Sequence, residues 1–351
     1  MPHNPNAHLR WRSYLSNLAL IWFTIWLCRA LPYYKGFLLA ETQQVLVVLA
    51  LAYTFGMLPF YVFAPDRMIK ESKSAVLLRV LLAFLLQSAK LIWERKYALL
   101  FRQRKLQREE KTAILFVIVK FIYIPMMVNF CFLNLHKMDA ALQTQISSGF
   151  FSFEYFDEIT LTFAAGVIYF IDTFIFAFAY TIEAGFLGNK VKSVEPTLLG
   201  WVVTLACYPP LSYASGSLIA LFPIYSGPSN LMVFVVGLLF FLSALVYLWS
   251  TIALGFKASN LTNRGIVSAG PYAFVRHPAY IMKALGWWVY AIPSIVYVLS
   301  PLRSIILIAS LVSWSFIYYL RAYTEERHLL QDPDYVKYRK KVKYMFIPGV
   351  F

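Results

Sequence analysis

Charged residues are scarce in this sequence. They make up 14% of the 351 residues, whereas 60% are hydrophobic. A soluble globular domain usually carries about 25% charged residues. Several apolar runs reach or approach the roughly 20 residues that a membrane-spanning helix needs. The low charge therefore argues against a soluble domain and predicts an all-α, polytopic transmembrane helix bundle.

Acidic residues and cysteines are also few. There are 17 Asp and Glu against 32 Lys and Arg, and only three cysteines, with no C-x-x-C pair. The cysteine spacing excludes a disulfide framework or a zinc site, so no metal is expected. In a membrane protein, the positive excess is explained by cytoplasmic loops and by anionic lipid headgroups at the cytoplasmic face, so no nucleic-acid partner is expected.

The apolar runs predict about eight spans. They cover residues 14–31, 44–63, 112–135, 158–182, 197–222, 230–256, 279–299 and 302–323. A further run at 75–93 carries a polar stripe that includes Arg79, Gln87 and Lys90 at helical spacing. This stripe predicts a helix lying at the membrane interface, and the alternative is a ninth span.

The distribution of basic residues predicts the orientation. With eight spans, Arg10, Arg12, the basic segment 94–111 and the basic C-terminal tail fall on one side. Because Lys and Arg mark the cytoplasmic side, both termini are expected in the cytoplasm. The protein is then an integral, multi-pass protein of a bacterial inner membrane or an equivalent cytoplasm-facing membrane.

Two regions of one membrane domain are expected along the chain. Residues 1–256 form an amino-terminal transmembrane bundle with an acceptor cavity, and residues 257–351 form a cofactor-binding region. Within the first region, Pro209 and Pro210 should interrupt the helix of 197–222. Interrupted backbone at membrane depth is tolerated only inside the protein or along a wet cavity.

The stretch "GPYAFVRHPAYIMKALGWW" (270–288) joins a turn to an apolar helix. Pro278 suits the first turn of that helix, so His277 lies at a helix start, where free N–H groups favour an anion. Arg276 adds a planar fork for a carboxylate or a phosphate. The alternative is that Arg276 only anchors the cytoplasmic end of a span.

Two adjacent acids, Glu325 and Glu326, end the last predicted span. Acids oppose the dipole at a helix C-terminus, so their presence needs another reason. Pairing with Arg321, Arg327 or His328 is one such reason, and a cationic or hydroxyl-bearing ligand is the other. Because the two spans are consecutive and antiparallel, the Arg-His pair and the Glu-Glu pair can close on one pocket. S-adenosylmethionine carries a carboxylate, an ammonium and a ribose diol that match this set.

The combination of R-H-P-x-Y, a helical hairpin and E-E resembles the isoprenylcysteine carboxyl methyltransferase family. The resemblance covers about residues 257–351, including "DPDYVKYRKKV" and "FIPG" in the tail. It implies a membrane-embedded methyltransferase that moves a methyl group from S-adenosylmethionine to a lipophilic acceptor. The implied cofactor-binding residues are Arg276, His277, Pro278, Tyr280, Glu325 and Glu326, of which Arg276 and Glu326 are the catalytic candidates. The acceptor is a membrane lipid or a prenyl-type carboxylate, phosphate or amine.

Two other functions compete with this interpretation. Sterol reductases related to the lamin B receptor end in a similar turn and a similar basic tail, and they use NADPH. A non-enzymatic transporter or scaffold would instead have charge pairs within the membrane and no cofactor. The sequence "GIVSAGPYAFVRHPAY" followed by "TEER" favours the methyltransferase.

Three further residues are candidates for binding the acceptor. Asp172 lies in the middle of a span, where acids are costly and often functional. Asn263 and Arg264 precede the R-H-P turn and can touch the acceptor headgroup. The structural alternatives are a buried pair of Asp172 with Lys120 or with a tyrosine hydroxyl, and turn capping by the loop residues.

The side chains of His277 and Glu326 are expected to lie outside the packed apolar middle of the bundle. Substitution of His277 by Ala or Glu326 by Gln should then remove cofactor binding and leave the fold intact.

Overall fold

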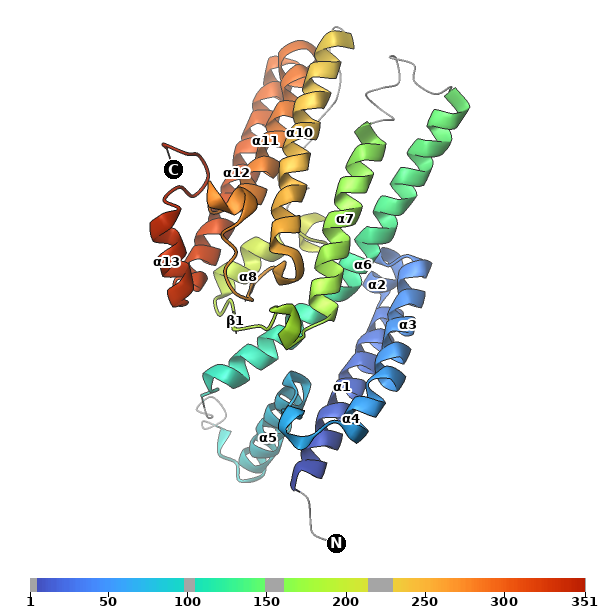
Figure 1. Ribbon diagram of the computed structural model, residues 1–351, viewed down its shortest axis with the longest axis vertical. Coiled ribbons are helices and arrows are strands. Elements are labelled where there is room, and N and C mark those ends of the chain that lie inside the picture. The colour runs from blue at the N-terminus through green and yellow to red at the C-terminus, as the bar shows by residue number, and fades with distance from the viewer. Residues whose placement is uncertain (1–4, 98–104, 149–160, 214–229, 351) are drawn as a thin grey trace. The chain divides into compact units, whose positions relative to one another are not determined.

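The computed structural model describes residues 5–97, 105–148, 161–213 and 230–350 of the chain. These residues are mostly helical, and the strands among them are β1 (Ser193–Val194) and β2 (Thr262–Asn263). In Figure 1 most of the described chain is drawn as coiled ribbon, that is, as helix. The predicted all-α transmembrane bundle is confirmed.

The chain divides into two compact units, Met1–Asn129 and Phe130–Phe351. The division falls inside the long helix α6 (Arg108–Ser148). The R-H-P-x-Y sequence and the two glutamates both belong to the second unit. The expected division between residues 1–256 and 257–351 stays a prediction.

The first unit packs around α1 (Pro5–Ala30). Its other elements are α2 (Pro32–Phe37), α3 (Ala40–Gly56), α4 (Leu58–Phe63), the 3-10 turn η1 (Asp66–Met68), α5 (Lys73–Trp93) and the first part of α6. Tyr14, Tyr61 and Ile69 form one buried cluster. Asn129 ties the chain between α2 and α3 to α6, since its Oδ1 accepts hydrogen bonds from the Leu39 N–H and the Thr42 hydroxyl.

The second unit is built on three consecutive long helices. They are α10 (Asn230–Leu254), α11 (Pro278–Pro293), which continues as the π-helical turn η7 (Ser294–Val298), and α12 (Pro301–Leu329). The remaining elements are the second part of α6, α7 (Leu161–Thr181), η4 (Gly185–Leu187), β1, α8 (Leu198–Leu205), η5 (Gly255–Lys257), β2, η6 (Gly270–Ala273) and α13 (Pro333–Lys341). β1 and β2 pair antiparallel, with Ser193 opposite Asn263.

Close packing of the three long helices positions the site. Gly286 of α11 lets α10 approach, because a Cβ there would lie 3.0 Å from the Ser243 hydroxyl oxygen. Trp287 of α11 packs edge-on against Trp314 of α12. As a result, the start of α11 and the end of α12 lie at the same end of the unit (Figure 1).

Seven helical segments of the described residues are long and apolar enough to cross a membrane. They are Ala40–Phe63, Lys73–Trp93, Arg108–Thr144, Leu161–Thr181, Phe234–Lys257, Pro278–Tyr297 and Pro301–Leu329. Six of them coincide with spans expected from the sequence. The expected first span corresponds to α1, which is outside this set.

Two predicted segments differ from these helices. The expected span 197–222 is represented by the short helix α8, which ends before Pro209 as its prolines predict, and residues 214–229 lie outside the described residues. The run at 75–93 belongs to α5, which is itself long and apolar enough to span a membrane. Its interfacial location stays a prediction.

Candidate functional site

The R-H-P turn forms the start of α11. Pro278 is the first residue of the helix, and His277 is its N-cap, although the His277 side chain makes no capping hydrogen bond. The imidazole instead stacks on the Tyr280 ring, with centroids 5.4 Å apart and planes inclined by 9°. The sequence therefore predicted the helix start correctly, and the stacking fixes the orientation of the histidine ring.

Arg276 and Glu326 form a buried ion pair between the turn and α12. The Arg276 Nε atom lies 2.5 Å from the Glu326 Oε1 atom, and both side chains are more than 90% buried. The His277 Nε2 atom is 3.4 Å from the same carboxylate oxygen. The two halves of the motif are thus in direct contact, as the antiparallel hairpin predicts.

The same turn holds the C-terminal segment of the chain. Arg276 Nη1 donates hydrogen bonds to the carbonyl oxygens of Val342 and Lys343. The backbone N–H groups of Arg276 and His277 donate to the carbonyls of Tyr344 and Met345, at 3.0 Å each. Arg276 therefore connects three segments: the turn, the end of α12 and the tail.

These contacts bury the side chains of the motif. His277 and Glu326 were expected outside the packed apolar middle of the bundle, and at the turn they are buried, with 6% and 7% exposed. The reason is the C-terminal tail, which packs against the turn. Their roles in cofactor binding and catalysis stay predictions, and the structure gives them an additional role in holding the tail.

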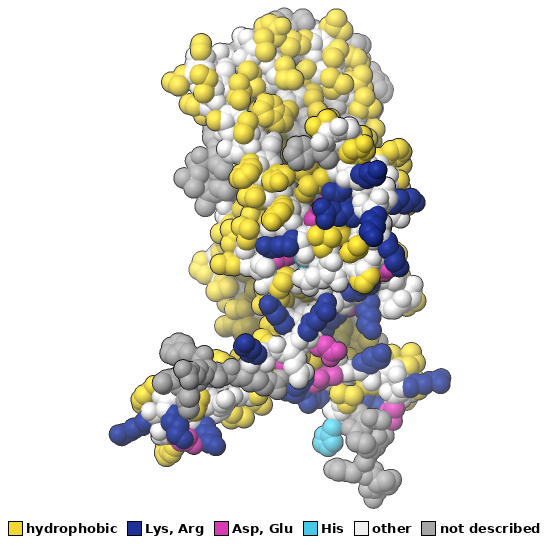
Figure 2. Space-filling view, turned by 90° about the vertical axis from the view of Figure 1, so that its left-hand side faces the viewer, with side chains coloured by type: hydrophobic (Ala, Val, Ile, Leu, Met, Phe, Trp, Pro, Cys, Tyr) yellow, Lys and Arg dark blue, Asp and Glu magenta, His cyan; other side chains and the backbone are white. Residues whose placement is uncertain are grey.

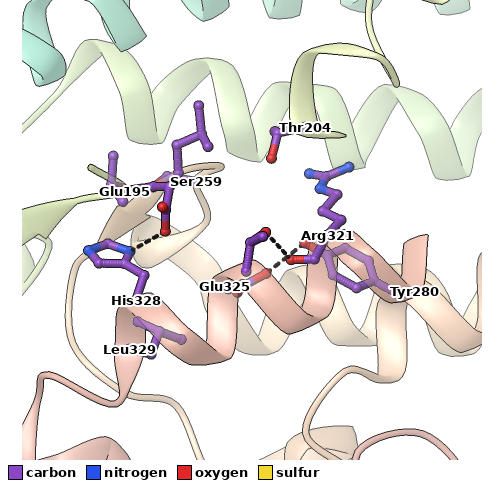
Figure 3. Close-up of a pocket in the computed structure, with 11 residues that line it drawn as sticks. Glu195, Thr204, Ser259, Tyr280, Arg321, Glu325, His328 and Leu329 are labelled. Atoms are coloured by element: carbon purple, nitrogen blue, oxygen red, sulfur yellow. Dashed lines mark hydrogen bonds and ion pairs between the residues drawn. The ribbon is translucent and has the colours of Figure 1, made fainter. Parts of the chain in front are cut away.

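A small cavity lies beside this network and contains the other two motif residues, Tyr280 and Glu325. The Tyr280 hydroxyl donates to Glu325 Oε2 at 2.7 Å. The volume of this cavity is about 20 Å³. The cavity is lined by Glu195, Thr204, Ser259, Leu261, Thr262, Tyr280, Arg321, Thr324, Glu325, His328 and Leu329 (Figure 3). The cavity combines carboxylates, a guanidinium and an aromatic ring.

Arg321 supplies the cation of this cavity. It is 5% exposed, and its guanidinium carbon lies 5.0 Å from the centre of the Tyr280 ring. It also donates a hydrogen bond to the Asn260 side-chain oxygen. From the sequence, Arg321 was considered only as a partner for the glutamates. Its position four residues before Glu325 places both on one face of α12, which is the signal that could have identified it.

Glu195 and His328 form the opposite wall, as the labels in Figure 3 show. The Glu195 side chain accepts hydrogen bonds from the Thr197 N–H and hydroxyl. The His328 Nε2 atom is 2.8 Å from the Ser193 hydroxyl oxygen. Glu195 was not among the residues selected from the sequence. No local pattern indicates it, because it reaches the cavity through the pairing of β1 with β2.

The three residues expected to bind the acceptor lie elsewhere in the second unit, and the cavity lining does not include them. Asp172 accepts hydrogen bonds from the Tyr247 hydroxyl at 2.9 Å and from Thr251 at 2.6 Å. The Asn263 amide donates to Asp332 at 2.8 Å, and Arg264 donates to the Ala179 carbonyl at 2.6 Å. Their acceptor roles stay predictions.

The comparisons with known proteins identify one region of the chain. Residues 230–331 match the model of the isoprenylcysteine carboxyl methyltransferase (ICMT) family. Neither the curated proteins nor the solved structures include a match. The matched residues include α10, α11, α12 and the six motif residues, whereas Glu195, Thr204 and the C-terminal tail lie outside them. This confirms the resemblance based on R-H-P-x-Y and E-E, and the ICMT-like region of the chain indicates a membrane methyltransferase.

Proposed function

We propose that this protein transfers a methyl group from S-adenosylmethionine to a lipophilic acceptor in the membrane. One observation carries the proposal. The hydroxyl of Tyr280, from R-H-P-x-Y, donates to Glu325, from E-E, in a cavity that also contains Arg321. This cavity lies largely within the ICMT-like region.

The residues of the cavity suit the polar groups of this cofactor. Arg321 can hold a carboxylate through a planar fork of donors. Glu325 and Glu195 can accept hydrogen bonds from an ammonium or a ribose diol. The open space of about 20 Å³ is far smaller than a nucleoside, so binding requires the lining side chains to separate.

When bound, S-adenosylmethionine supplies an electrophilic methyl group on a sulfonium. The residues of the chain then have three tasks. Arg321 and Glu325 orient the ligand, since direct displacement needs a fixed line of reacting atoms. The buried Arg276–Glu326 pair keeps the C-terminal tail over the turn and limits the access of water. A carboxylate or phosphate acceptor needs no base, whereas an amine needs one, and Glu326 and His277 are then the candidates.

Ligand binding provides the first test. We expect the purified protein to bind S-adenosylmethionine or its demethylated product in calorimetry. Tyr280→Phe removes only the hydroxyl that donates to Glu325. A hydrogen bond to a charged group contributes about 1.5–3 kcal/mol, so binding should weaken roughly tenfold to a hundredfold if the ligand engages this pair. Tyr323→Phe is the matched control, because Tyr323 is an exposed tyrosine of α12, the helix that carries Glu325.

Other calorimetric results would favour the competing functions. Heat with NADPH and none with S-adenosylmethionine or its demethylated product would favour a reductase. Heat with none of them would favour a transporter or scaffold. The acceptor class is tested separately by incubating the protein with a membrane lipid extract and S-adenosylmethionine labelled in its methyl group. We expect the label to appear in the lipid fraction, and its absence despite cofactor binding would contradict a lipid acceptor.

A further inference from the structure

A second, larger cavity lies apart from the candidate site in the same unit. Its volume is about 510 Å³, and it is formed by residues near η4, β1, η5, β2 and α13. Five of its lining residues are basic: Lys192, Lys257, Arg264, Lys337 and Lys341. One lining residue, Asp334, is acidic. Figure 2 shows Lys and Arg side chains gathered on the face of the molecule that is turned to the viewer.

Part of this positive charge is neutralised within the protein. The Lys192 ammonium lies 2.9 Å from Asp332 and 3.4 Å from Asp334. The Lys337 ammonium is 3.9 Å from Asp334. Across the described ranges, no carboxylate lies within ion-pair distance of Lys257 or Lys341. The cavity therefore keeps an excess of positive charge that a bound anion can neutralise.

The cavity lies at the ends of the candidate spans. Lys257 is the last residue of the span Phe234–Lys257. α13, which carries Lys337 and Lys341, begins at Pro333, shortly after the span Pro301–Leu329. Polar residues directly after the end of a span lie at the level of the lipid headgroups. An anion that is abundant at this level is a lipid phosphate.

We propose that this cavity binds a phosphate group, supplied by the headgroup of an anionic membrane lipid. Arg264 offers a planar guanidinium, and its position is fixed by the hydrogen bond from Nη1 to the Ala179 carbonyl. Lys257 and Lys341 add point charges from two other segments. The alternative source of the same chemistry is a soluble phosphate. The inference does not rest on the methyltransferase activity.

The experiment uses the full-length protein in a neutral detergent. Native mass spectrometry counts bound phosphatidylglycerol and phosphatidylcholine with identical acyl chains. The test variant is Lys257→Gln with Lys341→Gln. The control is Lys190→Gln with Lys340→Gln, which removes the same charge from exposed lysines that do not line the cavity. Inorganic phosphate, at constant ionic strength, is added as a competitor in a second arm.

We expect the test variant to bind phosphatidylglycerol about 25-fold more weakly than the unmodified protein. This corresponds to about fivefold for each lysine, or ~1 kcal/mol at a charged membrane surface. The control should change less than twofold. Millimolar inorganic phosphate that displaces the lipid from the unmodified protein and also binds by itself would show that the ligand is a soluble phosphate. The cavity would then still be a phosphate-binding site.

Two results would overturn the proposal. One is equal retention of phosphatidylglycerol and phosphatidylcholine by the unmodified protein. The other is an equal loss of phosphatidylglycerol in both double variants, which would show that the lysines act as diffuse surface charge. The melting temperature of each variant shows whether it is folded. Failure of S-adenosylmethionine or its demethylated product to bind leaves this lipid measurement unaffected. The proposed methyltransferase function and the proposed phosphate site can therefore fail separately.

Discussion

Two adjacent glutamates at the end of α12 have different environments. Glu326 is 7% exposed and paired with Arg276, whereas Glu325 is partly exposed and accepts the Tyr280 hydroxyl in the small cavity. Neighbouring positions on a helix point about 100° apart, so one carboxylate faces the turn and the tail while the other faces the cavity. Glu326 therefore has a structural role in holding the turn and the tail, and Glu325 is the carboxylate that is proposed to bind the ligand.

Glu326→Gln should destabilise the protein. The substitution leaves the Arg276 guanidinium buried without its carboxylate. Removal of one partner of a buried ion pair typically costs about 3–5 kcal/mol. We expect a clear decrease in the melting temperature without ligand, measured by tryptophan fluorescence in detergent. An unchanged melting temperature would show that the pair contributes little to stability and would return Glu326 to a purely catalytic role.

Glu325→Gln is the complementary variant. Only one hydrogen bond to this carboxylate is altered, so stability should fall by about 1 kcal/mol or less. Binding of S-adenosylmethionine should instead weaken roughly tenfold or more, because a carboxylate for the ammonium or the diol is lost. Calorimetry and melting curves on both variants give the comparison. Normal binding by Glu325→Gln would exclude the small cavity as the cofactor site.

At the scale of elements, α13 is anchored by its N-cap, Asp332. The Asp332 carboxylate accepts hydrogen bonds from the Asp334 N–H at 3.0 Å, from Asn263 at 2.8 Å and from Lys192 at 2.9 Å. Burial alone raises the pKa of Asp332, but the hydrogen bonds from Lys192, Asn263 and the Asp334 N–H outweigh it, so the pKa lies below its usual value. The charged form thus stabilises the junction of β2, α12 and α13.

Asp332→Asn should remove part of the acid sensitivity of the protein. Since the native pKa is lowered, the carboxylate stabilises the fold above the usual Asp value of about 3.9, and this contribution is lost as the pH falls through the native pKa. Asn keeps the capping geometry, so the expected loss at pH 7 is roughly 1 kcal/mol. Melting temperatures of the variant and the unmodified protein should differ at pH 7 and converge as the pH falls below the lowered native pKa of Asp332. A constant difference across this range would contradict the assignment.

The contact between α10 and α11 depends on a small residue. A Cβ at Gly286 would lie 3.0 Å from the Ser243 hydroxyl oxygen and 3.4 Å from a ring carbon of Phe240. Small residues allow helices in membranes to approach closely. Gly286→Leu should therefore push the helices apart and destabilise the unit by about 1–3 kcal/mol.

Thermal melting in detergent measures this effect. The control is Gly185→Leu, because a Cβ at Gly185 meets no atom within 4 Å. A similar decrease in both variants would point to a general effect of an added leucine. Because α11 carries the R-H-P turn at its start, Gly286→Leu should also weaken ligand binding.

At the scale of the whole molecule, the distribution of Lys and Arg between the two ends of the predicted spans predicts the orientation in the membrane. Reporter fusions at His3 and after Phe351 should both indicate the cytoplasm. Labelling of single cysteines introduced at Arg67 and Lys105, which flank α5, tests the interfacial helix. Labelling from the same side supports an interfacial α5, and labelling from opposite sides shows that α5 spans the membrane.

Some features of the candidate site could be predicted from sequence patterns, and others could not. Pro278 begins α11 as its missing N–H predicts, and the hairpin brings Arg276 to Glu326 as antiparallel spans require. Glu195 could not be predicted in this way. It enters the cavity through a strand pair of two residues, which is too short to leave a periodic pattern. The deep burial of Glu326 likewise depends on the position of the tail.

The sequence by itself determined the helical membrane bundle, the boundaries of most long helices and the meeting of the two motif halves. Hydropathy, proline positions and helix periodicity are local properties, and they carry this information directly. Only the tertiary structure decided the different environments of Glu325 and Glu326, the place of Arg321 in the small cavity and the gathering of Lys257, Arg264 and Lys341 around the larger one. These outcomes depend on contacts between segments that are distant in sequence, and the local pattern around each residue does not contain them.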